Sequence, residues 1–305
     1  MEYKKIIIDQ MKILILGGSG LVGSTLAQSL KTENEIHVTF NTHNIDENFS
    51  KTQMNLLNDY EKLDNLIDEF EPNVIVNTIA YPNVDFCETH QKDANYLHVE
   101  IVKKLIVKCN KMKIKQIYLS TDAVFDGNLD DISKYVESDL PNPLSYYGKT
   151  KLDAENCLLY PNSNHVVLRT TVIYGWHEKS RFTNWVLKKL ENNEEIPGFI
   201  DQKNTPTLVD DLVIAIKKII EKNISGLFHA TGNSCLSRYD FARLLAQKFD
   251  FSENLVKPVI SKNTQAAPRP VNGCLSSELL ENTINFKFST IENGINFMLN
   301  KKNIS

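Results

Sequence analysis

The 305-residue sequence has few cysteines and no long apolar run. Its five cysteines are odd in number, widely spaced and never arranged as CxxC, which argues against a disulfide framework or a zinc site. We therefore expect reduced thiols in a cytoplasmic protein. No stretch approaches the roughly 18 apolar residues of a membrane-spanning helix, so no membrane partner is predicted.

Arginine is also scarce, because only five of the 34 basic residues are Arg. Against 38 acidic residues the formal net charge is −4, a poor electrostatic basis for binding nucleic acid. The seven histidines form no HExxH motif, and we predict no metal site. The composition, with 42% hydrophobic residues, 12 Gly and 10 Pro, is that of a globular protein with room for about two domains.

Short β-branched runs alternate with amphipathic segments, which is typical of βαβ units. Strands are expected at 12–16, 35–40, 73–77, 115–120, 165–170 and 226–231, and helices at 21–30, 60–70, 94–110, 146–159, 182–190, 208–221 and 239–249. The pattern predicts an α/β fold: a Rossmann-like, doubly wound parallel sheet over residues 11–172, to which a segment at about 205–232 returns. The remainder of 173–305 is expected to form a smaller C-terminal α/β substrate lobe, and 1–10 an N-terminal extension.

A glycine-rich turn follows the first strand and opens the first helix. Gly17, Gly20 and Gly23 would allow a tight turn, close approach of a pyrophosphate and close helix packing, and Leu21 and Val22 lie in the same turn. An ordinary glycine turn without a ligand is the alternative. The second strand ends in uncharged residues, Thr39 to Asn44, where an NAD-binding chain would carry an acid. This favours NADPH as cofactor, with NADH as the alternative.

Tyr147 and Lys151 are four residues apart at the start of a predicted helix, hence on one face. One YxxxK is expected by chance, so its position carries the argument: the helix follows the loop that leaves the strand ending in Ser120 and Thr121. A phenol could protonate a nascent alkoxide if a neighbouring ammonium lowered its pKa, and Thr121 could hydrogen-bond the same carbonyl. The alternative is a surface pair without chemistry.

Together these segments resemble the dTDP-4-dehydrorhamnose reductase family of the extended short-chain dehydrogenase/reductases. The resemblance covers residues 11–297 and includes ILGGSGLVG (15–23), VIVNTIAYPNVDFCE (74–88), LSTDAVFDG (119–127), PLSYYGKTKLDAE (143–155) and APRPVNGCL (267–275). It implies reduction of the C4 ketone of a nucleotide-linked 6-deoxysugar by a nicotinamide, most directly dTDP-4-dehydrorhamnose to dTDP-rhamnose.

The resemblance also implies roles for individual residues. Thr121, Tyr147 and Lys151 would be catalytic; Asn184, Trp185 and Arg269 would lie near the sugar nucleotide; and the cofactor would contact Lys151 together with the glycine turn, Asn41, Asn55, Leu56, Thr78, Ala80 and Tyr81. Arg269 could grip a diphosphate, or only brace the chain between Pro268 and Pro270.

Three other readings of the same resemblance bear on function. Ala123 follows Asp122 where sugar-nucleotide dehydratases carry a Glu, which argues against elimination of water. The regulatory subunit of methionine adenosyltransferase resembles the same family, so a dinucleotide-binding regulatory subunit is one alternative. A nucleotide-sugar 4-epimerase is another, and a homodimer is the expected assembly.

Overall fold

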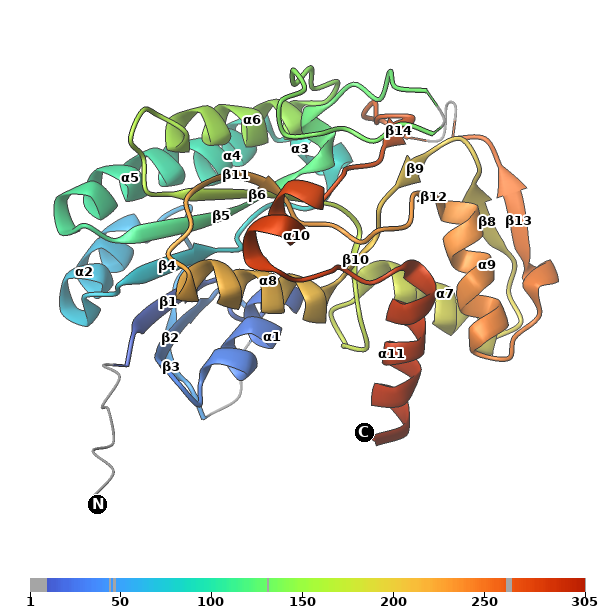
Figure 1. The fold of residues 1–305 in the computed structure, drawn as a ribbon, viewed down its shortest axis with the longest axis horizontal. Helices are drawn as coiled ribbons and strands as arrows, with labels where there is room; N and C mark the ends of the chain where they lie inside the picture. Colours follow the sequence, from blue (N-terminus) through green and yellow to red (C-terminus); the bar gives the residue numbers. More distant parts are fainter. Residues whose placement is uncertain (1–9, 44, 46–47, 131, 262–264, 305) are drawn as a thin grey trace.

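The computed structural model describes residues 10–43, 45, 48–130, 132–261 and 265–304. Of the N-terminal extension expected at residues 1–10, all but Gln10 lies outside the described residues. The fold has a large parallel sheet covered by helices on both faces and a second lobe beside it (Figure 1).

The main sheet has seven strands, all parallel, with β1 near its middle. Across the sheet they are β11 (Gly226–His229), β6 (Val166–Thr170), β5 (Lys115–Thr121), β4 (Val74–Asn77), β1 (Lys12–Leu16), β2 (Glu35–Phe40) and β3 (Ser50–Gln53). The strand order reverses between β1 and β4, so the chain leaves a crevice at the carboxyl ends of these strands. The predicted α/β, Rossmann-like fold is confirmed.

Helices cover both faces because alternate strand residues point to opposite sides. Ile13 and Ile15 face one apolar cluster, which includes residues of α1 (Leu21–Leu30), α8 (Val209–Glu221) and α10 (Glu278–Ile284). Leu14 and Leu16 face another, with α2 (Tyr60–Phe70) and α5 (Ile101–Met112). Beside α5 on this face lies α6 (Tyr146–Leu158), which packs on Tyr118 and Val167. The returning segment thus supplies both a covering helix, α8, and an edge strand, β11.

The helix expected over 94–110 is interrupted in the structure. It consists of α4 (Gln91–Asn95), a π-helical turn η1 (Tyr96–Glu100) and α5. The turn places the buried His98 ring between two partners, because its Nε2 accepts from the Tyr81 amide at 2.9 Å and its Nδ1 lies 2.9 Å from Thr150 Oγ1. Apolar spacing does not reveal such a bulge, because the buried stripe continues through it.

The second lobe has its own apolar cluster, built from α7, α9, α11 and the segments between them. Its elements are β7 (Ile173–Tyr174), α7 (Arg181–Glu191), β8 (Ile196–Phe199), β9 (Lys203–Asn204), β10 (Thr207–Leu208), β12 (Leu236–Ser237), α9 (Arg238–Lys248), η3 (Glu253–Leu255), β13 (Val256–Val259), β14 (Asn272–Gly273) and α11 (Ile291–Ile304). Two short elements, α3 (Val84–Thr89) and η2 (Asp122–Val124), lie in the loops after β4 and β5. Within the described part of the chain, no helix is long and apolar enough to cross a membrane.

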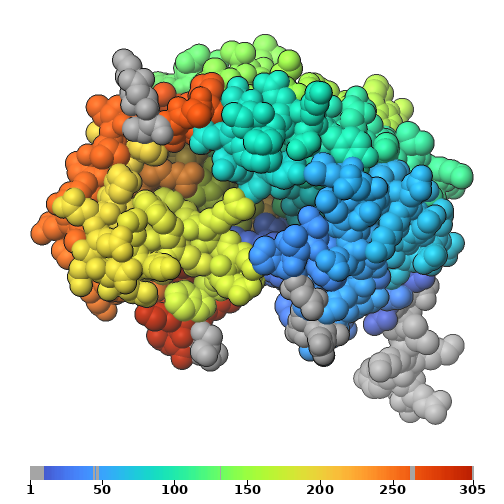
Figure 2. All heavy atoms as spheres, turned by 180° about the vertical axis from the view of Figure 1, so that it is seen from behind, coloured from blue at the N-terminus to red at the C-terminus, as the bar shows by residue number. Residues whose placement is uncertain are grey.

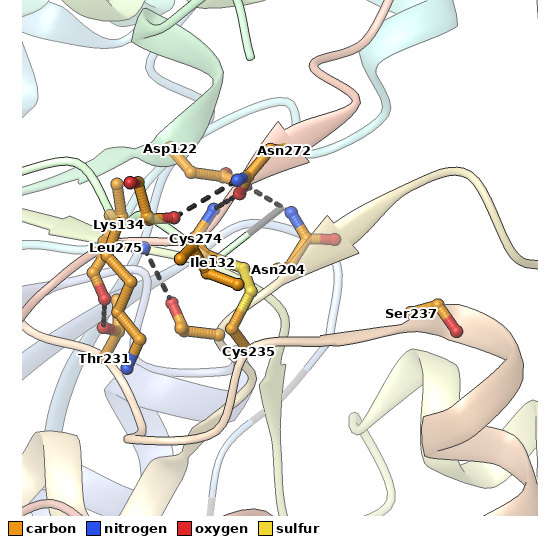
Figure 3. The surroundings of a disulfide bond; sticks show 12 residues. Asp122, Ile132, Lys134, Asn204, Thr231, Cys235, Ser237, Asn272, Cys274 and Leu275 are labelled. Carbon is orange, nitrogen blue, oxygen red and sulfur yellow. Dashed lines mark hydrogen bonds between the residues drawn. A yellow bond between two sulfur atoms is a disulfide. The ribbon is translucent and has the colours of Figure 1, made fainter. Parts of the chain in front are cut away.

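The expectation that all five cysteines are reduced is wrong, because Cys235 and Cys274 form a disulfide (Figure 3). Cys235 directly precedes β12 and Cys274 directly follows β14, and both strands pair with β9 at Asn204. The two cysteines are 39 residues apart in sequence, yet their Cα atoms are 5.6 Å apart. Sequence spacing could not indicate this pair, since only the shared strand brings them together.

We expect reduction of this disulfide to lower the free energy of unfolding by about 2–4 kcal/mol, because the unfolded chain regains the entropy of an open loop. Urea unfolding with and without a dithiol reductant measures the difference. The Cys235→Ser variant should show the reduced stability without reductant and no further loss with it. As the control, Cys157→Ser, which removes a free thiol, should keep the response of the unmodified chain. An unchanged unfolding curve on reduction would contradict a disulfide that stabilises the lobe.

Candidate active site

A cleft of about 960 Å³ lies where the second lobe meets the carboxyl ends of the parallel strands. Figure 2 shows the surface hollowed between the N-terminal half, in blue and cyan, and the second lobe, in yellow. Most residues proposed from the sequence line this cleft: Gly17, Gly20, Leu21, Val22, Asn41, Asn55, Leu56, Thr78, Ala80, Tyr81, Thr121, Tyr147, Lys151, Asn184 and Arg269.

Two of the proposed residues do not line the cleft. Trp185 is 40% exposed on α7, with its ring 6.1 Å from that of Phe182, which does line the cleft. Gly23 lies behind the glycine turn, where a Cβ would approach the Gly17 carbonyl oxygen to 2.3 Å. Gly23 therefore serves the close packing of α1 on the turn, and Trp185 is a poor candidate for direct contact with a ligand.

In the glycine turn, packing leaves no room for a Cβ at Gly17, Gly18 or Gly23, whereas it leaves room for one at Gly20. Gly17 has φ +87°, and a Cβ there would lie 2.7 Å from Thr78 Oγ1. Gly20 has φ −83°, and its Cβ would meet only the Gly17 carbonyl oxygen, at 3.4 Å. The packing of the protein itself thus tolerates a side chain at Gly20, whose absence leaves the cleft open at the start of α1.

The first turn of α1 offers unsatisfied donors to this space. Within the described residues, the amides of Leu21, Val22 and Gly23 donate no hydrogen bond, no side chain caps the helix and no acidic residue lies in its first turn. The cleft-lining residues that the structure describes include only two carboxylates, Asp122 and Glu178, and neither lies at the end of β2. The turn therefore fits a dinucleotide phosphate, and the end of β2 has no charge that would repel a 2′-phosphate.

Tyr147 and Lys151 are brought to the cleft by the close approach of α6 to the end of β5. Ser145 caps the helix by accepting from the Gly148 amide at 3.2 Å. A Cβ on Gly148 would lie 2.1 Å from the Ala123 carbonyl oxygen, so only glycine allows this approach. Lys151 Nζ donates to the Leu119 carbonyl at 2.6 Å and lies 3.9 Å from the centre of the Tyr118 ring.

The acidities of this pair differ from those expected. Burial raises the pKa of the Tyr147 phenol above its ordinary value, although a hydrogen bond with Thr121 opposes the change. Burial also lowers the pKa of Lys151 to about 7, against the charge of Glu155. The expectation that the ammonium lowers the phenol pKa is wrong for the protein alone, because burial dominates and the nearby Asp122 and Cys87 also raise the pKa. Tyr147 consequently keeps its proton at neutral pH.

The second lobe contributes an arginine that the sequence did not single out. Arg238, at the first position of α9, lines the cleft with its guanidinium 5.1 Å from the Phe182 ring. Within the described residues it donates no hydrogen bond, and the nearby Asp122 carboxylate attracts it. The Ser237–Asp240 capping box marks the start of α9 in the sequence, but nothing in the sequence shows where the arginine points.

Arg269, by contrast, already has an anionic partner. Its Nη1 and Nη2 donate to the two carboxylate oxygens of Asp85 at 3.1 and 2.9 Å, and Nη1 also donates to the Ala267 carbonyl at 2.9 Å. The same pairing holds the pKa of Asp85 below its ordinary value. Arg269 therefore links the segment after residue 265 to α3, and its fork is less available to a ligand than that of Arg238.

Asp122 lies between the catalytic candidates and the second lobe. Its carboxylate accepts from Asn204 Nδ2 at 2.6 Å and from Thr121 Oγ1 at 3.1 Å, and burial raises its pKa. A Cβ on Gly273 would lie 2.6 Å from it. Among the residues that the structure describes, no group of three or more His, Cys, Asp or Glu side chains is placed to hold a metal ion.

Comparisons with known proteins agree with this architecture. Residues 11–304 match the family model described as the RmlD substrate binding domain. The chain is 32% identical to methionine adenosyltransferase 2 subunit beta of Rattus norvegicus over 90% of this chain and 83% of that protein. It is 31% identical to a dTDP-4-dehydrorhamnose reductase of Aggregatibacter actinomycetemcomitans, over 87% and 90%. A crystal structure of dTDP-4-dehydrorhamnose reductase from Bacillus anthracis in complex with NADP matches with a TM-score of 0.84 and 24% identity, covering 96% and 99% of the chains.

We expect Lys151→Met to stabilise the protein relative to the unmodified chain by an amount that grows as the pH falls from about 10 to about 7. The lysine has a pKa of about 7 when folded against an ordinary value of 10.5, so between these values the unfolded chain binds more protons. Stability of the unmodified chain then falls with falling pH. Urea unfolding at roughly pH 7 and pH 9.5 measures this difference.

The matched control is Lys149→Met, which changes an exposed lysine on the same helix and should give no such pH dependence. If Lys151→Met changed the free energy of unfolding equally at both pH values, burial of the charged ammonium would not be the cause of the destabilisation.

Proposed function

The chain belongs to the family of the RmlD substrate binding domain, and from this membership and the cleft geometry we propose that it is an NADPH-dependent nucleotide-sugar reductase. The proposed reaction is reduction of the C4 ketone of a nucleotide-linked 6-deoxysugar, dTDP-4-dehydrorhamnose to dTDP-rhamnose. One observation carries the proposal: Thr121, Tyr147 and Lys151 lie in the same cleft as the open glycine turn.

Support for the cofactor comes from the turn and from relatives. The unsatisfied amides at the start of α1 would bind the pyrophosphate, and Gly20 would let it approach the backbone. The uncharged end of β2, with Asn41 and His43 lining the cleft, favours NADPH over NADH. The Bacillus anthracis reductase holds NADP in a protein of the same fold. When bound, the reduced nicotinamide would supply the hydride.

The side chains provide the proton chemistry. Tyr147 is protonated at neutral pH, so its hydroxyl can donate to the oxygen that gains negative charge as the ketone is reduced. Thr121, hydrogen-bonded to Tyr147, would orient the same oxygen. The Lys151 ammonium, fixed on the Leu119 carbonyl, would stabilise the phenolate that remains.

Arg238 is the proposed contact for the diphosphate of the substrate. It lines the cleft without a hydrogen-bond partner among the described residues, and a guanidinium forms paired hydrogen bonds with phosphate oxygens. Asn184 is a weaker candidate, because its amide nitrogen already donates to the His177 and Glu178 carbonyls at 2.9 and 3.0 Å.

We expect the protein to consume NADPH when given dTDP-4-dehydrorhamnose, and Tyr147→Phe to lose at least about a hundredfold in turnover, since the proton donor is removed. The measurement is the loss of NADPH absorbance with time. Tyr146→Phe is the control, because this neighbour does not line the cleft, and it should change turnover much less. Equal losses in the two variants would contradict the assignment.

We expect Arg238→Gln to raise KM for the nucleotide sugar about tenfold or more, with little change in KM for NADPH, because a charge-assisted contact to the substrate is lost. Steady-state kinetics with each substrate varied in turn provide the test. The control is Arg243→Gln on the same helix. The Arg243 guanidinium pairs with Glu253 at 2.6 Å and does not line the cleft. A rise in KM for NADPH alone would instead indicate that Arg238 contacts the cofactor.

A regulatory subunit is the second candidate function, because the identity to methionine adenosyltransferase 2 subunit beta is as high as that to the reductase. Such a protein would bind the cofactor and a methionine adenosyltransferase, yet would turn over no sugar. Copurification with that enzyme, together with absent NADPH consumption for several dTDP-4-dehydro sugars, would favour it. A 4-epimerase would interconvert sugars without net consumption of cofactor.

A cytoplasmic location and a homodimer accompany this proposal. The reaction needs NADPH and an activated sugar in one compartment, which cell fractionation would test. Light scattering during size-exclusion chromatography would measure the mass of the assembly.

A further inference from the structure

Three successive residues of β5 are each bonded to one of three residues on a single stripe of α6. The Leu119 carbonyl accepts from Lys151 Nζ, the Ser120 hydroxyl donates to Glu155 Oε1, and Thr121 is hydrogen-bonded to Tyr147. Tyr147, Lys151 and Glu155 are spaced four residues apart and so share one helix face. The proposed catalytic pair therefore has a third member on its face, Glu155, for which the proposed reaction gives no role.

Glu155 is one half of a buried ion pair. Arg169 Nη2 lies 2.7 Å from Glu155 Oε2, and Arg169 Nε lies 3.1 Å from both carboxylate oxygens. The side chains are 1% and 3% exposed, and neither residue lines the cleft. Phe125 packs on the guanidinium at 4.9 Å, and His229 Nε2 lies 3.5 Å from Nη1.

Stability alone is a weak reason for such a pair. Desolvation of two charges offsets much of their attraction, and apolar residues of similar volume are often equally stable at such a position. What apolar residues could not provide is a negative charge one helical turn from Lys151 together with an acceptor for the Ser120 hydroxyl.

We propose that Glu155, held by Arg169, is a positioning residue that increases the charged fraction of the buried Lys151 side chain and holds the end of β5 against α6. This role rests on the proposed function for its consequence in turnover, but its effect on Lys151 is a property of the free protein. Three residues on one face of α6, Tyr147, Lys151 and Glu155, would then act together at the site.

The surroundings of Lys151 support the assignment. Glu155 is the carboxylate that acts on the ammonium, and it opposes the burial that lowers the lysine pKa to about 7. Cys87, from α3, acts in the same direction but more weakly, and its own pKa is raised to about 11, so it is a neutral thiol at pH 7.

The other neighbours of Lys151 bring no compensating negative charge near neutral pH. His98, from η1, has a pKa lowered to about 3 by burial and so is neutral. The phenols of Tyr118, from β5, and Tyr147 are protonated, because burial raises the pKa of both. Loss of the Glu155 charge would therefore leave the ammonium with little to oppose its desolvation.

The experiment compares Glu155→Gln with the unmodified chain by following the titration of Lys151 in protein carrying ¹³C-labelled lysine. Its signal is assigned by its loss in Lys151→Met. We expect the midpoint to fall by about one pH unit or more. The alkaline limb of kcat/KM should move the same way, because the ammonium is lost at lower pH, giving about a tenfold loss on that limb.

Two further variants separate the charge from the structural contacts. Glu155→Gln leaves Arg169 buried without its partner, which is strongly destabilising and can prevent folding. The double variant Glu155→Gln/Arg169→Gln removes both charges. Because the Arg169 charge that opposes the ammonium is lost too, its midpoint should still fall, but by less than in Glu155→Gln. Ser120→Ala keeps the carboxylate and loses only the hydroxyl, so its Lys151 midpoint should match that of the unmodified chain.

An unchanged Lys151 midpoint in the folded Glu155 variants would overturn the proposal, as would an equal drop in Ser120→Ala. The titration needs no turnover, so it distinguishes failure of this proposal from failure of the proposed function. If the protein reduced no sugar but showed the predicted shift in the Lys151 midpoint, only the proposed function would be contradicted.

Discussion

The close packing of α6 on the end of β5 is the contact on which the site depends. Gly148 has no room for a side chain beneath the Ala123 carbonyl, so the first turn of the helix lies directly on η2, the short helix that follows Thr121. From there the helical repeat presents Tyr147, Lys151 and Glu155 in turn to the last residues of the strand. A shift of either element by one residue would separate all three contacts, since they share one register.

Burial rather than charge dominates the electrostatics of this contact. The Lys151 ammonium is nearly inaccessible to solvent, and its pKa falls to about 7, while burial raises the pKa of Tyr147. The same enclosure explains why a buried ion pair lies one turn further along α6. In a low-dielectric setting, a fixed carboxylate acts strongly on an ammonium one helical turn away. If the proposed role of Lys151 holds, its burial is a cost in stability that accompanies function.

The second lobe shapes the other wall of the cleft through links that are far apart in sequence. Asn204 bonds Asp122, Asp85 pairs with Arg269, and Cys235 bonds Cys274 beside the same short strand, β9. Two of these links, Asn204 to Asp122 and Arg269 to Asp85, join the lobe to η2 and α3 on the other side of the cleft. Arg238 lines the same cleft beside the Phe182 ring, where the Asp122 carboxylate attracts it and no hydrogen bond holds it among the described residues.

The sequence by itself determined six of the seven strands of the main sheet, most helices and the glycine turn, because their hydrophobic periods and turn residues are local signals. It missed the edge strand β3, whose residues are mostly polar and half-buried or exposed. It also indicated Tyr147 and Lys151, whose four-residue spacing is meaningful on any helix. It could not indicate the π-helical turn at Tyr96–Glu100, the Cys235–Cys274 bond, or the pairing of Arg269 with Asp85, which leaves Arg238 as the cleft guanidinium better placed for a ligand. Each of these depends on partners brought together by strand pairing and lobe packing, and the direction of the pKa shifts depends on burial. Only the tertiary structure decides burial and contact between distant residues, because both arise from the packing of the whole chain.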